Sequence, residues 1–334
     1  MILIPDFLFR VAFPQSILTL FLGLFFPSAQ ADELAGDWSL TLQSGTPGWL
    51  SLKKVEGKTV VKMRLHVGSE GPHEVIKEEG GRLSFNLRRN KKGKGSRMVD
   101  LGMKGGKLEG VVVSTSKDGA VQRDPFSGKK IPPMPVSPPD LSKVRFGLPG
   151  SIFNGKDLTG WRPHEADKLN GWSVKDGLLV NATPKTDFSA TGAYANLRTE
   201  AVYEDFWLHI EFLIEEKRNS GVYLRGMYEA QVVDRDSRMQ GLQGVGSIFG
   251  RIAPSKNAGK AGGEWQTYDL TLVDRHMTVI LNGEKVIDNQ PVHGPSGGAP
   301  FTDPTHPGPI HLQGDHTSVA YRNIYLAPVI IEQK

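Results

Sequence analysis

One short segment of the chain, Tyr223–Asp234, concentrates side chains that can transfer protons or form hydrogen bonds to a ligand. If its second half forms a strand, Glu229 and Gln231 point to the same face, because side chains alternate along a strand. Arg225, on the preceding run, could then lie beside Glu229 across a tight turn and either orient its carboxylate or bind substrate oxygens. A cross-strand ion pair on a sheet surface would show the same spacing, so this pattern leaves both interpretations open.

Four further residues are candidates for the same chemistry. Asp234 falls at the end of the expected strand, where it is either functional or part of a solvated loop. Glu264 and Trp265 begin a later strand, and the indole could stack on a ligand or fill the core. His316 is a candidate acid or base because histidine titrates near neutral pH, although a loop histidine can also simply cap a turn.

Several common kinds of catalytic site are not indicated. The sequence has no cysteine, so it predicts neither disulfides nor thiolate chemistry. It has no His-x-x-x-His pair and no calcium-type acidic loop, so we predict no cofactor while leaving a divalent metal possible. The glycine-rich run 241–250 is not followed by a helix and is therefore not a dinucleotide loop. No nucleophile elbow for a Ser-His-Asp triad is recognisable.

Short strands must position these residues. From about residue 151 onward, roughly a dozen apolar runs separated by turns, without a helical period, predict two packed sheets. Upstream, Asp37–Val113 alternates apolar and polar residues between glycine pairs, which indicates an antiparallel meander and a small barrel. Its opening, Gly36-Asp37-Trp38, resembles the start of lipocalin-like barrels. We therefore predict an all-β protein.

A signal-like N-terminus and a proline-rich stretch in the middle of the chain predict an exported two-domain protein. Residues 1–31 resemble a signal peptide, with Arg10, the apolar run Ser16–Phe26 and the cleavage motif Ala29-Gln30-Ala31. An uncleaved anchor is the alternative, and no other segment is long enough to cross a bilayer. We predict a barrel over 32–124, a proline-rich linker over 125–145 and a second domain over 146–334. The expected location is periplasmic or secreted.

The two halves differ in charge. Residues 33–145 contain 21 Lys and Arg against 12 Asp and Glu, a net charge of +9, whereas residues 146–334 contain 18 against 22, a net of −4. A basic barrel could bind an anionic polymer, and the basic stretch Arg88–Arg97 could help to hold it. A solvated basic surface explains the same composition. We expect no nucleic-acid partner.

Nine sequence blocks in the second half, in order, resemble the 3-keto-disaccharide hydrolase family. The similarity covers about 180 residues and leaves the N-terminal half unmatched. One departure is an extra residue in the family's Leu-Gln-x-His block, which reads Leu312-Gln313-Gly314-Asp315-His316 here. The blocks that carry the resemblance are Ile152–Trp161, Asn219–Gly226, Tyr228–Asp234, Gly246–Gly250, Ala253-Pro254, Gly263–Gln266, Leu281–Gly283, Gly308–Gln313 and Tyr321–Ile324.

The resemblance implies a concanavalin-like jelly roll acting on glycosides whose C3 hydroxyl has been oxidised to a ketone. It favours the functional interpretation of Glu229 and Arg225. As site residues it implies catalytic Glu229, Asp234 and His316, with substrate bound by Tyr223, Arg225, Gln231, Glu264, Trp265 and Gln313.

A 3-keto group acidifies the proton on C2, so a base can remove it and the glycosidic oxygen on C1 can leave by elimination. Addition of water then completes a net hydrolysis that needs a base, a donor for the enolate oxygen and an acid for the leaving group. A non-catalytic carbohydrate-binding module is the main alternative, because fold alone does not determine function. A conventional glycosidase is a weaker one. The number of titratable candidates favours an enzyme.

Overall fold

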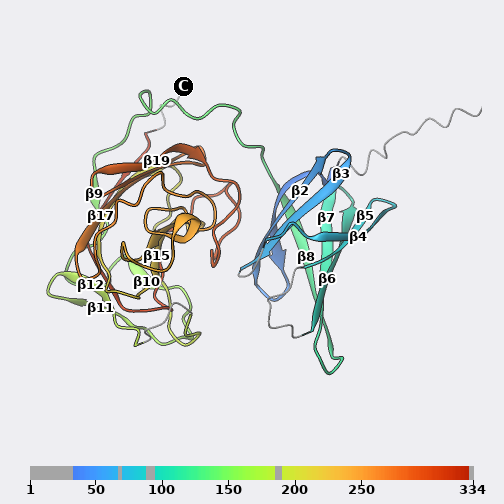
Figure 1. The fold of residues 1–334 in the computed structure, drawn as a ribbon, viewed down its shortest axis with the longest axis horizontal. Coiled ribbons are helices and arrows are strands. Elements are labelled where there is room, and N and C mark those ends of the chain that lie inside the picture. The colour runs from blue at the N-terminus through green and yellow to red at the C-terminus, as the bar shows by residue number, and fades with distance from the viewer. Residues whose placement is uncertain (1–32, 67–69, 88–94, 185–189, 331–334) are drawn as a thin grey trace, which may run out of the picture.

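The computed structural model describes residues 33–66, 70–87, 95–184 and 190–330. The chain forms two β-rich units, an N-terminal barrel and a C-terminal sandwich (Figure 1). This confirms the all-β prediction. The predicted signal peptide and most of the basic stretch 88–97 lie outside the described residues. No helix in the described ranges is long and apolar enough to cross a membrane.

The N-terminal unit is an eight-stranded antiparallel meander that almost closes on itself. Its strand order is β3-β2-β1-β8-β7-β6-β5-β4. The two end strands approach each other where His73 N donates to Val61 O at 2.8 Å and Met63 N to Glu70 O at 2.8 Å. The strands are β1 (Gly36–Leu42), β2 (Pro47–Val55), β3 (Lys58–Leu65), β4 (Glu74–Glu79), β5 (Arg82–Asn86), β6 (Ser96–Lys104), β7 (Lys107–Thr115) and β8 (Val121–Ile131).

Alternation along these strands builds the barrel core. Trp38, Leu40 and Leu42 of β1 are all buried and belong to one apolar cluster inside the barrel. The last strand continues through Ile131, paired with both β1 and β7. The expected linker start at residue 125 was therefore wrong: Pro125 lies within β8, where the ladder tolerates its missing N–H, and the irregular connection begins after Ile131.

The C-terminal unit is a sandwich of two antiparallel sheets, which confirms the predicted jelly roll. The smaller sheet has the order β10 (Trp161–Pro163), β13 (Leu197–Thr199), β20 (His311–Leu312), β15 (Ser220–Leu224), β16 (Tyr228–Val232). The larger has the order β11 (Trp172–Lys175), β12 (Leu178–Asn181), β21 (Val319–Pro328), β14 (Phe206–Leu213), β17 (Trp265–Val273), β18 (His276–Leu281), β19 (Glu284–Pro291), with β9 (Gly150–Ser151) beside β21. A short 3-10 helix, η1 (Gly241–Gln243), follows β16.

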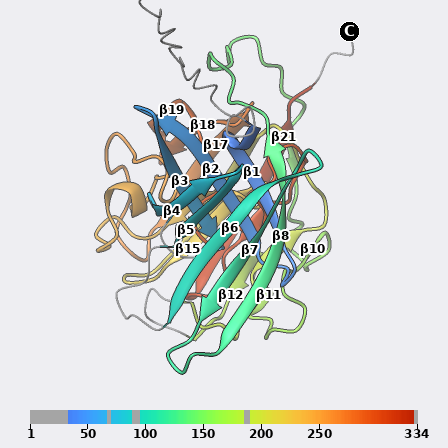
Figure 2. The ribbon, with the colours of Figure 1, turned by 90° about the vertical axis from the view of Figure 1, so that its right-hand side faces the viewer.

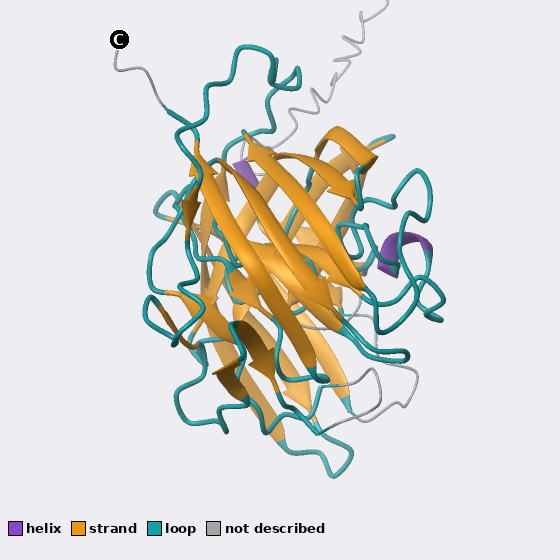
Figure 3. Cartoon of the chain, turned by 90° about the vertical axis from the view of Figure 1, so that its left-hand side faces the viewer, coloured by secondary structure: helices purple, strands orange, loops and turns teal. Residues whose placement is uncertain are grey.

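The two sheets differ in how their outer faces are covered. In β14 of the larger sheet, buried residues alternate with partly exposed ones, and Figure 3 shows the broad outer face of this sheet. In β15 and β16 of the smaller sheet every residue is buried. The barrel lies on the side of the smaller sheet (Figures 1 and 2). The outward side chains of the smaller sheet are therefore enclosed.

Candidate functional site

Three neighbouring strands of the smaller sheet place a tyrosine, a glutamate and a histidine side by side. Tyr223 of β15 pairs with Glu229 of β16 and, on its other side, with His311 of β20. Directly paired residues of antiparallel strands point to the same face. The adjacent residues Val222 and Ala230 lie in the core between the sheets, so the Tyr223, Glu229 and His311 side chains point outward, toward the barrel.

Glu229 is the most strongly perturbed carboxyl of this face. It is 3% exposed, and burial raises its pKa to about 8. The Tyr223 hydroxyl opposes that rise, the charge of Asp315 adds to it, and the charge of Arg64 lowers the pKa. The carboxyl lies over Gly221, where a Cβ atom would come within 2.3 Å of Glu229 Oε1. Only glycine at 221 leaves room for the observed position of the carboxyl.

Tyr223 connects this carboxyl to two other groups. Its hydroxyl donates to Gly297 O at 2.9 Å and lies 3.4 Å from Gln313 Nε2. Burial and the neighbouring Glu229 raise the pKa of Tyr223 well above its ordinary value. The phenol therefore remains protonated and can act as a hydrogen-bond donor.

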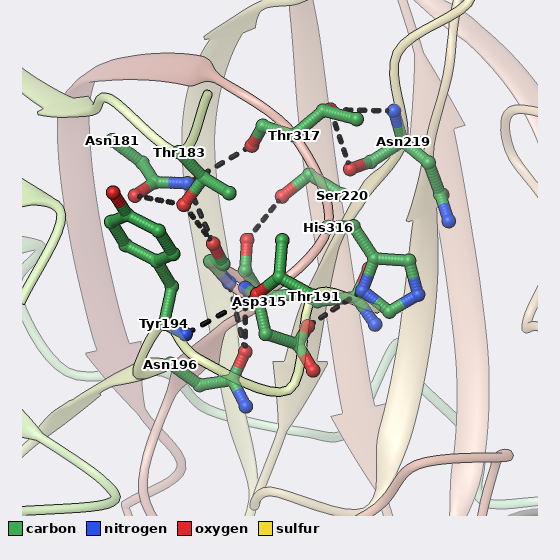
Figure 4. Close-up of polar contacts among 12 residues, drawn as sticks. Asn181, Thr183, Thr191, Tyr194, Asn196, Asn219, Ser220, Asp315, His316 and Thr317 are labelled. Atoms are coloured by element: carbon green, nitrogen blue, oxygen red, sulfur yellow. Dashed lines mark hydrogen bonds and ion pairs between the residues drawn. The ribbon is translucent and has the colours of Figure 1, made fainter. Parts of the chain in front are cut away.

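His316 forms a pair with the residue before it. His316 Nδ1 lies 2.6 Å from Asp315 Oδ1, as Figure 4 shows. The loop that carries them is fixed by Asn196, whose side-chain oxygen accepts from Gly314 N at 2.8 Å. The extra residue of this block thus belongs to a well-anchored loop. The Asp315 charge raises the pKa of Glu229, and Gln313, two residues before Asp315, lies 3.4 Å from the Tyr223 hydroxyl.

Two histidines that the sequence reasoning missed complete this face. The His311 ring lies 5.2 Å from the Tyr223 ring and 5.3 Å from the His164 ring. Burial lowers the pKa of His311 well below its ordinary value, so it is neutral. The Nδ1 atoms of both histidines are buried without a protein partner. His311 and Gln313 are two positions apart, and that spacing could have placed the histidine on the site face.

Gln231 is placed on the same face as predicted. It pairs with Gly221 across the sheet and is 1% exposed. Its Nε2 contacts only the Met239 sulfur, at 3.7 Å, and its Oε1 is buried without a protein partner. Together with the two histidines, Gln231 therefore offers unused polar atoms to a ligand.

Arg225 and Asp234 occupy structural positions instead. Arg225 lies in the turn after β15 with a φ of 55°, where strand alternation no longer holds, and its Nη2 donates to Pro304 O at 2.8 Å. The expected contact with Glu229 is not formed. Asp234 accepts the backbone N–H of Asp236 at 3.0 Å and of Lys217 at 3.3 Å. Its side chain thus fixes a turn.

Glu264 and Trp265 lie away from this site. Trp265 pairs with Leu213 at the start of β17 in the larger sheet. Its ring is covered by Arg322, whose guanidinium carbon lies 3.9 Å from the ring centroid. Trp265 thus lies on the outer side of the opposite sheet. Glu264 immediately precedes it, in an exposed turn. Glu229 and Trp265 are separated because their strands, β16 and β17, belong to different sheets.

Within the described ranges, no group of three or more His, Asp or Glu side chains is arranged to hold a metal ion. The site consists of Tyr223, Glu229, Gln231, His164, His311, Gln313 and the Asp315–His316 pair.

Comparison with known proteins places this site inside a recognised domain. Residues 149–327 match the profile of the 3-keto-alpha-glucoside-1,2-lyase-like domain. The chain belongs to this family. It is therefore a carbohydrate-active protein, and every residue of the site lies within the matched region. The barrel lies outside it. A search of curated protein sequences found no match.

The solved structures that are similar to this chain include proteins whose names describe them as glycosyl hydrolases. Two Parabacteroides distasonis proteins assigned as glycosyl hydrolases are 20% and 23% identical, with TM-scores of 0.43 and 0.41. The alignments cover 55% and 54% of this chain and 94% and 98% of theirs. SCLam, a non-specific endo-β-1,3(4)-glucanase of family GH16, is 13% identical with a TM-score of 0.34, over 58% of this chain and 93% of its own.

Proposed function

We propose that this protein cleaves glycosides that carry a ketone at C3, using Glu229 and His316 to transfer protons. The observation that carries the proposal is the buried Glu229 carboxyl, which is paired with Tyr223 across the sheet and is acted on by the charge of Asp315, the partner of His316. A group whose pKa lies near the working pH can both give and take a proton, which is what acid–base catalysis requires. The family membership supports the proposed substrate class.

His316 suits the role of the base that removes the C2 proton. Its Nδ1 is bound to Asp315, which orients the ring and leaves Nε2 for the substrate. Removal of the proton turns the electron pair of the C2–H bond into an enolate over C2, C3 and the ketone oxygen. The Tyr223 hydroxyl, kept protonated by burial, can donate to that oxygen when its single proton turns away from Gly297 O.

Glu229 suits the role of the acid. With a pKa of about 8 it is mostly protonated at neutral pH and can protonate the glycosidic oxygen as the C1–O bond breaks. The enolate electrons form the C1–C2 double bond, and the aglycone leaves with the proton. Addition of water across this bond gives the free 3-keto sugar and completes the hydrolysis.

Two substrates that differ in whether the leaving group needs a proton test whether Glu229 acts as the acid. The mature chain, residues 32–334, is incubated with a 3-keto disaccharide and with 4-nitrophenyl 3-keto-glucoside, whose nitrophenolate leaves without protonation. Glu229→Gln should abolish cleavage of the disaccharide and retain much of the cleavage of the aryl glycoside. Equal loss on both substrates would remove Glu229 from the acid role. If the wild-type protein cleaves neither substrate, the proposed reaction is refuted.

We also propose that the protein is exported, on the support of the signal-like pattern before Asp32. Mass spectrometry of the protein from its native host should give a mature N-terminus at Asp32. An intact N-terminus retained in the membrane fraction would indicate an uncleaved anchor instead.

A further inference from the structure

The loop between β19 and β20, residues 292–310, covers the candidate site and is called here the bridging loop. Its Gly297 carbonyl accepts the Tyr223 hydroxyl at 2.9 Å. Its Ser296 hydroxyl accepts the backbone N–H of Glu229 at 3.1 Å. The two residues at the centre of the site are thus both bonded to this loop.

The barrel holds the other side of the bridging loop. Gly298 N donates to His66 O at 2.8 Å, and the Ser39 and Thr302 hydroxyls lie 2.9 Å apart. Lys129 of the barrel pairs with Asp303 of the loop at 3.0 Å. Figures 1 and 2 show the barrel against this side of the sandwich. The loop is therefore fixed between the two units.

One barrel residue, Arg64 of β3, reaches the part of the loop that bonds Tyr223. Its side chain is 11% exposed, and its Nη2 donates to Glu70 at 2.9 Å. A Cβ atom on Gly297 would lie 2.8 Å from Arg64 Nη1, so the guanidinium packs directly on Gly297. Its positive charge acts on both Glu229 and Tyr223.

Arg64 is itself held in place by a charged group shared between the units. Glu70 also binds Arg251 of the sandwich, with Nη1 to Oε2 at 2.6 Å, and Arg251 Nε donates to Pro295 O at 2.8 Å. Burial alone would raise the pKa of Glu70, but the charges of Arg251 and Arg64 outweigh it and hold that pKa below its ordinary value. Glu70 therefore stays ionised and fixes both arginines.

We propose that the barrel is a constituent part of the active site and that Arg64 is its positioning residue. Arg64 braces Gly297, the acceptor of the Tyr223 hydroxyl, and supplies a fixed positive charge toward the place where the enolate develops. The inference rests on the proposed function. It also gives the barrel a role that the family-matched region alone does not provide, since residues 149–327 contain neither Arg64 nor Glu70.

The test compares variants of the full mature chain. Arg64→Met should lower kcat/KM for a 3-keto disaccharide about 10- to 100-fold, because small displacements of catalytic groups cost rates of that order. Arg64→Lys should restore part of the loss by returning the charge. Arg82→Met is the matched control, since Arg82 is an exposed barrel arginine that pairs only with Asp100 across the surface. It should stay within about twofold of wild type.

A second readout does not depend on activity. The groups that act on the Glu229 carboxyl are Tyr223, Asp315 and Arg64. Carbon-13 NMR can follow the titration of the Glu229 carboxyl, whose signal is assigned because it is missing from the spectrum of Glu229→Gln. The pKa of Glu229 should therefore be higher in Arg64→Met than in wild type and unchanged in Arg82→Met. If Arg64→Met fails to unfold cooperatively, Gly297→Ala takes its place, because the added Cβ displaces the guanidinium without removing its charge.

The outcomes separate the two proposals. A wild-type enzyme that cleaves the keto substrate, with Arg64→Met and Gly297→Ala matching it in both kcat/KM and Glu229 titration, would overturn the role of Arg64. An inactive wild type would refute the proposed function, and the NMR titration would then decide alone whether Arg64 acts on Glu229.

Discussion

The buried Glu229 carboxyl predicts a specific dependence of stability on pH. In the unfolded chain this group titrates near 4.5, whereas in the folded protein burial raises its pKa to about 8. The folded state therefore binds this proton more tightly than the unfolded state. Glu229→Gln keeps the shape of the side chain and removes the titration, which makes it the appropriate perturbation.

The sign and size follow from the two pKa values. Below pH 4.5 both states carry the proton and Glu229 contributes no pH dependence. Between pH 4.5 and about 8, unfolding releases the proton, so the free energy of unfolding falls as pH rises. The difference between the two pKa values corresponds to a loss of about 5 kcal/mol in the free energy of unfolding, at 1.36 kcal/mol for each pKa unit. Above pH 8 the loss is complete and the dependence on this group ends.

Urea unfolding of wild type and Glu229→Gln, measured from pH 4 to 9, tests this. The difference in unfolding free energy, wild type minus variant, should fall by several kcal/mol across the window and be flat on either side. The subtraction removes groups that both proteins share. A difference that stays constant with pH would show that Glu229 titrates normally, and the burial argument for its role as an acid would be wrong.

Three further substitutions test the geometry. Gly221→Ala should reduce kcat about 100-fold and stability by about 1–3 kcal/mol, because the new Cβ would overlap the Glu229 carboxyl. Gly150→Ala is the control, because its Cβ would meet no atom within 4 Å. A fully active Gly221→Ala would contradict the position assigned to the Glu229 carboxyl. Asp315→Asn should lower kcat more than it changes KM, since it frees the His316 ring; a pure KM effect in steady-state kinetics would argue against a base. Trp265→Ala should leave kcat/KM within about twofold, because the ring lies on the outer side of the larger sheet; a large loss would place it at the substrate.

The sequence predicted the fold well where short-range patterns decide it. Alternation over Asp37–Val113 and the glycine pairs between its apolar runs predicted strands that the structure contains. The end of the barrel was predicted too early because proline was taken as a linker signal, whereas Pro125 is accommodated inside a paired strand. Local composition does not reveal which strand neighbours a proline has.

The site was predicted in part, and for the same reason. Glu229 and Gln231 were expected to share a face, and they do, because period-2 alternation is a local property. Arg225 was expected beside Glu229, but the turn breaks the alternation there. His164 reaches the site only through a long-range contact within the sandwich, and Arg64 only through a contact between the two units, and no single segment of sequence encodes either.

Deuterium incorporation tests the central claim most directly. The mature chain is incubated with a 3-keto-glucoside in D2O, and with the unoxidised parent glucoside, and early product is followed by proton NMR against an enzyme-free control for spontaneous exchange. The account predicts cleavage of the keto substrate alone, with deuterium at C2 of the released sugar, because water adds back across the C1–C2 bond after elimination. Cleavage with the C2 proton retained would contradict elimination at this site, and equal cleavage of the parent glucoside would contradict the need for the ketone.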